Sequence, residues 1–210
     1  MKRIETIASL ISSDNGDLLD IGSDHGYLPL LLLKGGFSSK LYASENKLGP
    51  FNNLTNSLKG TDITCLFGDG LEVYQENIKQ VVIAGMGGRL ISKILDGGKI
   101  HLASIERLIL EPQTDEDEMR RCLNDLKWKQ IYGVYIKEKG HIYPIEIYVK
   151  GEEKLSEDEI EFGKYQLNNK DLLLKEKLNK KIEILSKLSG EIKKQEELKL
   201  LSIMEKYYEN

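Results

Sequence analysis

The stretch Leu18-Leu19-Asp20-Ile21-Gly22-Ser23-Asp24-His25-Gly26 decides the fold of this chain. Its first four residues, three of them apolar, predict a buried strand, and the residues from Leu28 to Lys34 predict a helix directly after it. Glycine in a strand-to-helix turn lets a ligand approach the backbone, and the first N–H groups of the helix face the same crevice. The stretch therefore predicts a ligand site at the end of a strand.

The charge of this turn indicates which ligand it suits. Its spacing, Asp-x-Gly-x-x-x-Gly, differs from the Gly-x-Gly-x-x-Gly fingerprint of dinucleotide sites, and Asp24 stands where the middle glycine is often found. A carboxylate there repels a pyrophosphate but attracts a sulfonium and an ammonium group. The turn therefore favours S-adenosylmethionine over NAD as the cofactor.

Strand-like and helix-like segments alternate outside this turn, up to about residue 150. Further strands are predicted at residues 41–44, 63–67, 81–84 and 108–110, and helices at 4–11, after Pro50, and at 71–76, 89–95 and 115–126. Two longer β runs, at 129–137 and 142–150, predict a hairpin that turns at Gly140. Such alternation predicts a mostly parallel sheet with helices on both faces. The expected fold is α/β, with the Rossmann-like sheet of class I methyltransferases.

The composition changes after Gly151, and from Leu155 onward the chain has no proline and is rich in Lys, Glu, Leu and Ile. Two apolar stripes at helical spacing are formed by Leu172, Leu174, Leu178, Ile182, Leu185, Leu188 and Ile192, and by Leu198, Leu201 and Met204. They predict an antiparallel helical hairpin, resembling a short coiled coil, with its turn between residues 189 and 195. The predicted domains are therefore a catalytic domain at 1–151 and a helical hairpin at 152–210.

Acidic residues also follow the second and third predicted strands. Glu45 stands where an acidic residue binds ribose hydroxyls in nucleotide-binding sheets. Asp69, which precedes Gly70, can accept a hydrogen bond from an adenine amino group. Each of them alone could be only a helix cap. Acidic residues at the ends of three successive strands together favour the cofactor role.

The fourth predicted strand ends in Ala84-Gly85-Met86-Gly87-Gly88. The strand ends of open sheets are the usual ligand sites, and in this fold class the fourth faces the methyl-accepting atom. Three glycines leave room for a planar ring, and Met86 offers it a soft apolar contact. A flexible turn is the alternative. After the fifth strand, Glu111-Pro112-Gln113 could add polar groups at the same edge or could only start a helix.

These motifs together resemble the bacterial tRNA (adenine-N1)-methyltransferase family that modifies the adenosine at position 22 of tRNA. The matching pieces are the residues 20–29 (DIGSDHGYLP), 49–51 (GPF), 68–73 (GDGLEV), 83–88 (IAGMGG), 106–110 (ERLIL) and the turn at Pro112. The resemblance covers essentially the whole chain, because that family also ends in a helical, coiled-coil-like hairpin.

The resemblance implies methyl transfer from S-adenosylmethionine, which becomes S-adenosylhomocysteine, to N1 of an adenine that is unpaired or flipped out of folded tRNA. In the catalytic set that it implies, Asp24 stabilises the positive charge that develops on the ring. Tyr27 and His25 shape the adenine pocket, and Met86 and Gly87 line the acceptor side. The cofactor-binding residues that it implies are Asp20, Gly22, Ser23, Asp24, Gly26, Glu45, Asp69, Gly70, Ala84, Gly85 and Met86.

Composition limits the other classes of protein. The chain is 40% hydrophobic and 30% charged, as in ordinary globular proteins, and no apolar run is long enough to cross a bilayer. The N-terminus does not resemble a signal peptide, so we expect a cytoplasmic protein. The three histidines are isolated from each other and from Cys65 and Cys122, so no metal site is predicted, and both thiols are expected to be buried and reduced.

The net charge of −4 argues against nucleic-acid binding by bulk attraction alone. A local basic face could still form, although solvated surface is the more ordinary interpretation of its candidates: Lys34, Lys40, Arg89, Lys93, Arg120, Arg121, Lys127 and Lys129. The C-terminal hairpin could grip tRNA, support the catalytic domain or form a dimer interface. We expect a monomer or weak dimer.

Two other functions compete with the tRNA enzyme. One is a methyltransferase that acts on another RNA base or a different acceptor. The other is a non-catalytic RNA-binding module on a Rossmann-like scaffold. The acidic residues at three strand ends count against the second, and the missing dinucleotide fingerprint counts against an NAD-dependent oxidoreductase.

Overall fold

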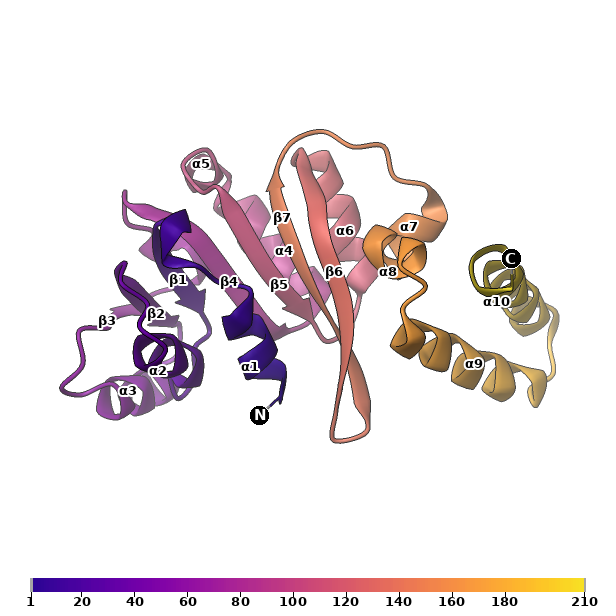
Figure 1. Ribbon diagram of the computed structural model, residues 1–210, viewed down its shortest axis with the longest axis horizontal. Coiled ribbons are helices and arrows are strands. Elements are labelled where there is room, and N and C mark those ends of the chain that lie inside the picture. Colours follow the sequence, from indigo (N-terminus) through magenta and orange to yellow (C-terminus); the bar gives the residue numbers. More distant parts are fainter. Residues whose placement is uncertain (1, 210) are drawn as a thin grey trace.

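The computed structural model describes residues 2–209, which contain a seven-stranded sheet in the order β3-β2-β1-β4-β5-β7-β6 (Figure 1). The strands are β1 (Asp17–Ile21), β2 (Leu41–Glu45), β3 (Thr64–Phe67), β4 (Ile78–Met86), β5 (Arg107–Pro112), β6 (Trp128–Glu138) and β7 (His141–Lys150). The first five strands are parallel, whereas β7 runs antiparallel to β5 and pairs with β6 as a hairpin. This arrangement confirms the predicted α/β fold.

Helices cover both faces of the sheet. Successive residues of a strand point to opposite sides, so each face presents apolar side chains that a helix can cover. Leu18 of β1 packs with the helices α1 (Lys2–Ser9), α2 (Tyr27–Lys34) and α3 (Leu48–Ser57). Its neighbour Leu19 packs on the other face with α4 (Gly88–Gly97), α5 (Lys99–Leu102) and α6 (Glu116–Asp125). Strands β4 and β5 alternate in the same way, so the central strands are apolar on both sides, as expected for a parallel sheet.

Several predicted elements differ in length from the observed ones. Helix α3 begins at Leu48, two residues before Pro50, which therefore lies within its first turn. The helix predicted over 71–76 is a 3₁₀ turn at Gly70–Val73 that buries Leu71 and Val73 before the chain becomes extended at Tyr74. A second 3₁₀ turn, at Ser13–Asn15, leads into β1.

The C-terminal part contains two helices that the sequence analysis missed. Helices α7 (Glu157–Phe162) and α8 (Lys164–Asn168) precede the predicted pair α9 (Leu172–Ser186) and α10 (Glu191–Tyr208). Helix α7 begins with a capping box, in which Ser156 and Glu159 each bond the backbone N–H of the other. Figure 1 shows α7 and α8 beside the sheet and α9 and α10 projecting beyond it. Helix α7 packs on α6, and α8 packs on β6.

Helices α9 and α10 are antiparallel, as predicted. Lys181 pairs with Glu196 near the turn, and the hydroxyl of Tyr208 donates to the carbonyl oxygen of Asp171 at the other end. Their core is formed by Leu174, Leu178, Leu185, Leu200, Ile203 and Met204. The predicted stripe was therefore partly wrong: Leu172, Leu188, Ile192, Leu198 and Leu201 are exposed. Leu200, Ile203 and Met204 share one helical face, which rotates Leu198 and Leu201 away from α9.

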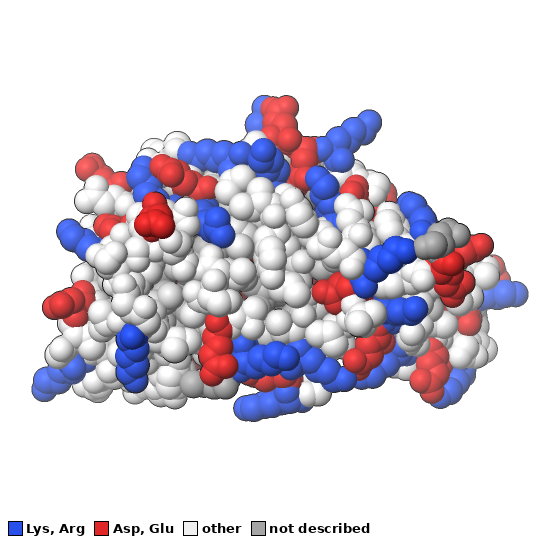
Figure 2. All heavy atoms as spheres, viewed as in Figure 1, with Lys and Arg blue, Asp and Glu red and all other residues white. Residues whose placement is uncertain are grey.

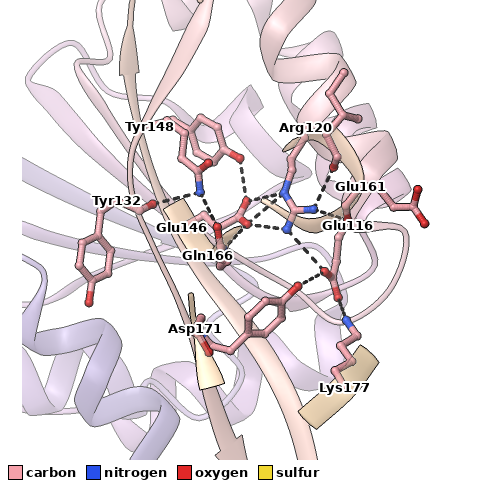
Figure 3. Close-up of polar contacts among 12 residues, drawn as sticks. Glu116, Arg120, Tyr132, Glu146, Tyr148, Glu161, Gln166, Asp171 and Lys177 are labelled. Carbon is pink, nitrogen blue, oxygen red and sulfur yellow. Dashed lines mark hydrogen bonds and ion pairs between the residues drawn. The ribbon is translucent and has the colours of Figure 1, made fainter. Parts of the chain in front are cut away.

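A buried ionic network joins this C-terminal part to the sheet (Figure 3). The guanidinium of Arg120, on α6, lies 2.6 Å from the carboxylate of Glu146 on β7, and both side chains are almost completely buried. Arg120 also donates to the carbonyl oxygens of Ile160 and Glu161, and Gln166 of α8 donates to Glu146. Arg120, which the sequence suggested for a surface patch, is instead an internal connector between α6, β7, α7 and α8.

Carboxylates from the C-terminal part also cover the outer edge of β6. The N–H of Gln130 donates to Glu153 at 2.6 Å, and the N–H of Tyr135 donates to Asp171 at 3.0 Å. Cys65 and Cys122 are free thiols, but both are partly exposed rather than buried. Among residues 2–209, no helix is long and apolar enough to span a membrane, and no cluster of three potential metal ligands occurs.

Candidate active site

The turn between β1 and α2 has the conformation that its glycines permit. Gly22 and Gly26 have φ angles of 72° and 68°, a region that favours glycine. Asp20, the fourth residue of β1, is buried, and its carboxylate accepts a 2.5 Å hydrogen bond from the hydroxyl of Ser23. Burial raises the pKa of Asp20 to about 6; the Ser23 hydrogen bond opposes this rise, and the charge of Glu45 adds to it. A cation bound beside Asp20 would favour its ionised form.

Asp24 joins this turn to the end of β2. Its backbone has a φ of 51°, and its N–H donates to the carboxylate of Glu45 at 2.8 Å. The side chain of Asp24 is 67% exposed and lies 3.7 Å from the imidazole of His25. The ring of Tyr27 lies 5.6 Å from that of His25. This corner therefore combines a solvent-facing carboxylate with two aromatic rings.

Two cavities lie at the carboxyl ends of the strands. The small cavity, of about 160 Å³, is lined by Ile21, Gly22, Ser44, Glu45, Asn46, Lys47, Gly68, Asp69, Gly70, Met86, Leu90 and Ile94. The large cavity, of about 500 Å³, is lined by Arg3, Ile4, Ile7, Asp20, Gly22, Ser23, Asp24, Tyr27, Leu28, Ala84, Gly85, Gln113, Glu138 and Lys139. Because Gly22 lines both, the cavities adjoin at the β1–α2 turn.

The boundary between the cavities is a close contact between Gly22 and Met86. A Cβ added at Gly22 would lie 2.2 Å from the terminal methyl group of Met86. In the small cavity, Asp69 accepts a hydrogen bond from the amide of Asn46 at 3.0 Å. The small cavity thus presents carboxylates beside an apolar wall, an arrangement that suits a nucleoside.

The turn after β4 is held against the turn after β5. Gly88 donates its N–H to Thr114 at 2.7 Å, and Gln113 donates to the carbonyl oxygen of Met86 at 2.8 Å. A Cβ at Gly88 would lie only 2.0 Å from the backbone oxygen of Asp115. Gly88 therefore permits a backbone contact that keeps Met86 and Gln113 in fixed positions beside the cavities.

The structure brings together most of the predicted site residues. Asp20, Gly22, Ser23, Asp24, Tyr27, Ala84 and Gly85 line the large cavity, and Gly22, Glu45, Asp69, Gly70 and Met86 line the small one. His25, Gly26 and Gly87 line neither. Gly26 instead starts α2, where a Cβ would meet Leu58, and Gly87 precedes α4 beside Thr114.

Sequence reasoning missed Arg3 and left the role of Glu111 open. Arg3 comes from α1, which was predicted only as an amphipathic helix, yet it lines the large cavity. Glu111 is completely buried below that cavity and accepts the N–H of Gly85 at 2.6 Å. The sequence did indicate Glu111, because it is a polar residue that follows the apolar run Leu108-Ile109-Leu110. Nothing in the sequence indicated that Arg3 lines the cavity.

The lining of both cavities fits S-adenosylmethionine. Asp20 and Asp24 at the large cavity suit a cationic ligand, and Glu45 and Asp69 at the small cavity can accept hydrogen bonds from ribose and adenine. Gly22 has no side chain at the place where the cavities meet, and the flexible side chain of Met86 contacts it there.

Known proteins are similar to this chain in both sequence and fold. Residues 18–208 match the family model described as tRNA (adenine(22)-N(1))-methyltransferase. The Bacillus subtilis (strain 168) protein of that name is 35% identical over 165 residues, which cover 76% of this chain and 68% of the relative. The solved structure of Streptococcus pneumoniae Sp1610 with S-adenosyl-L-methionine has 32% identity and a TM-score of 0.87, covering 100% of this chain and 98% of the other. The structure of M. capricolum TrmK with S-adenosyl-homocysteine has 26% identity and a TM-score of 0.83, covering 100% and 96%.

Proposed function

The chain belongs to the tRNA (adenine(22)-N(1))-methyltransferase family, and on that premise we propose that its two adjoining cavities hold the cofactor and the target adenine. The reaction is the transfer of a methyl group from S-adenosylmethionine to N1 of adenosine 22 in tRNA, which leaves S-adenosylhomocysteine. The observation that carries the assignment of sites is the shared lining residue Gly22, because donor and acceptor must meet at one point.

The cofactor would extend from the small cavity into the large one. Glu45 would bind the ribose hydroxyls and Asp69 the adenine amino group in the small cavity. Asp20 would face the ammonium and sulfonium charges, and its ionisation would be favoured by them. When bound, S-adenosylmethionine supplies an electrophilic methyl group. The role of this chain is to fix the position of that group and to exclude water from it.

The target adenine would enter the large cavity beside Tyr27, which is 47% exposed and available for stacking. N1 of neutral adenine has a free lone pair, so its attack needs little base catalysis. Alignment is then the main contribution, and proximity of this kind can be worth several kcal/mol. Positive charge develops on the ring, and the exposed carboxylate of Asp24 would stabilise it. His25, Gly26 and Gly87, which line neither cavity, stay predicted site residues.

The distribution of charge suits an RNA that is recognised by shape and backbone. Figure 2 shows acidic and basic side chains interspersed around much of the visible face, without one dominant sign. Lys and Arg gather at the lower edge, in the region where Figure 1 shows the start of α1 and the turn between β6 and β7. Arg3 and Lys139, from those two segments, line the large cavity. RNA phosphates would meet this edge when the adenine enters.

The C-terminal helices would extend the surface that contacts tRNA. We divide the chain into a catalytic domain, 1–151, and a helical domain, 152–210, since α9 and α10 have a core of their own. This division and a tRNA contact by the hairpin are parts of the proposal. Its action in the cytoplasm and its state as a monomer or weak dimer are also parts of the proposal.

The direct test uses purified protein, unmodified tRNA and methyl-labelled S-adenosylmethionine, followed by digestion and identification of the labelled nucleoside. We expect N1-methyladenosine, and no label on a matched tRNA that carries guanosine at position 22. A different methylated nucleoside would overturn the acceptor assignment. An absence of label, from protein that binds the cofactor in calorimetry, would point to another acceptor class.

A further inference from the structure

Glu111 connects three elements below the large cavity. It lies on β5 with no exposed surface, and one of its oxygens accepts the N–H of Gly85, on β4, at 2.6 Å. The other oxygen lies 3.5 Å from the guanidinium of Arg3, on α1. Gly85 and Arg3 both line the cavity, so one buried carboxylate contacts two parts of its wall.

The contact with Gly85 fixes an irregular part of the sheet. The register between β4 and β5 shifts between Ala84 and Met86, so Gly85 forms a bulge, and its φ is 78°. The Glu111 carboxylate satisfies the N–H of this bulged residue, and a charge-assisted bond of this kind is stronger than a neutral one. Glu111 thereby sets the direction of the strand end that faces the acceptor.

The contact with Arg3 fixes α1 as the opposite wall. The Arg3 backbone N–H donates to Glu138 at 3.3 Å, and its guanidinium lies 5.0 Å from the centre of the Tyr143 ring. The Nε of Arg3 and the Oε1 of Glu111 are buried without a hydrogen-bond partner among the described residues. Buried polar atoms of this kind call for a reason, because leaving them unpaired is costly. Helix α1 also lies outside residues 18–208, which the family model matches.

We propose that Glu111 is a positioning residue for methyl transfer, which in its ionised form holds Gly85 and Arg3 in place around the target adenine. This inference rests on the proposed function, because it concerns the acceptor side of the same cavity. Glu111 does not itself line the cavity. It acts through the two residues that do.

The charge state of Glu111 can be followed in the accessible pH range. Burial raises the pKa of Glu111 to about 7, although Arg3 and the Gly85 N–H favour the ionised form, and the charge of Glu138 adds to the rise. The charged groups that face it are thus Arg3 on α1 and Glu138 on β6, while β4 contributes only the backbone of Gly85. Because the charge of Arg3 lowers the pKa of Glu111, its removal should move the titration to higher pH.

The experiment compares kcat/KM for tRNA across pH in the wild type and in Glu111→Gln, Arg3→Met and Lys59→Met. In the wild type we expect kcat/KM to rise through about pH 7 as Glu111 ionises. Glu111→Gln should lack this rise and lose about tenfold in kcat/KM at about pH 8, while approaching the wild type at about pH 6. Arg3→Met should shift the rise to higher pH. Lys59→Met, which removes an exposed lysine that lines neither cavity, should retain the wild-type profile.

Calorimetry with S-adenosylmethionine and thermal melting will show that each variant is folded. The inference is overturned if Glu111→Gln keeps the wild-type pH profile, or if Arg3→Met leaves the midpoint unmoved. A wild-type protein that forms no N1-methyladenosine would instead overturn the proposed function, and this inference with it. The two failures are therefore distinguishable.

Discussion

Lys177 of α9 places its ammonium group 2.5 Å from a carboxylate oxygen of Glu116, the first residue of α6 (Figure 3). The other carboxylate oxygen accepts the hydroxyl of Tyr135 at 2.8 Å. Burial works against ionised Glu116, but the charges of Lys177 and Arg120 outweigh it, so the pKa of Glu116 lies below its ordinary value. Glu116 follows Asp115, whose backbone touches the Gly88 turn, so the C-terminal hairpin is tied to a segment that borders the active site.

Lys177→Met should weaken this connection. We expect a loss of about 1 to 2 kcal/mol in the free energy of unfolding, because the Lys177 side chain is partly exposed while Glu116 is mostly buried. Hydrogen exchange should become faster in α9 and α10 before it does in the sheet. Lys180→Met is the matched control, since Lys180 pairs with Glu176 at the surface of the same helix, and it should change little. Equal losses in both variants would contradict the prediction.

Arg120→Met should be far more destabilising. It leaves the Glu146 carboxylate buried and without its cation, which typically costs about 3 to 5 kcal/mol. Urea unfolding measures this loss. The double variant Arg120→Met/Glu146→Gln should recover part of it, because the uncompensated charge is gone. Arg121→Met, which removes an exposed pair with Glu157, should change the stability little.

Gly88→Ala should disturb the contact between the turns after β4 and β5. The added methyl group would lie 2.0 Å from the backbone oxygen of Asp115, so one of the two turns must move. We expect a loss of about 1 to 3 kcal/mol in stability and a larger relative loss of methyl transfer. Gly97→Ala, at the end of the same helix, has open space around the new Cβ and should be neutral or slightly stabilising.

Stability without cofactor should depend on pH through Asp20. Its pKa is raised from 3.8 to about 6 in the folded chain, so the folded state holds a proton that the unfolded state has released. The protonated Asp20 therefore stabilises the folded state below about pH 4. This stabilisation, at most about 3 kcal/mol, is lost as the pH rises through about 6. Asp20→Asn should remove this part of the pH dependence in urea unfolding. An unchanged slope between about pH 4 and 6 in this variant would show that another group is responsible.

The fold was predictable because its signals are local. Each strand before α6 contains a short apolar segment, such as Val81-Val82-Ile83 in β4, so the order of elements can be predicted along the chain. Helices α7 and α8 were not predicted because they are short and polar, and their few apolar residues do not reveal a helical periodicity. The inner face of α10 was misassigned because Leu198, Leu200 and Leu201 are all apolar, and only contact with α9 selects among them.

The site was predictable where it depends on strand ends, which meet at one edge of a parallel sheet. Asp20, Glu45 and Asp69 belong to that class, and each lines a cavity. Arg3 and Glu111 could not be paired from the sequence, because 107 residues separate them and only the packing of α1 brings them together. Arg120 was predicted to be a surface cation for a related reason. Its partner Glu146 lies on a strand of the predicted hairpin, and nothing in that strand's sequence indicates a buried ion pair.

The two carboxylates that cover the β6 edge have a consequence for folding in the cell. An uncovered edge strand is a template for strand addition from another molecule. Glu153 and Asp171 satisfy two N–H groups of β6, and both follow the sheet in the chain. During synthesis the edge therefore stays open until these residues emerge. A chain that stops near Gly151 should leave β6 uncovered and polymerise through it. The C-terminal segment therefore also protects the folded protein from aggregation.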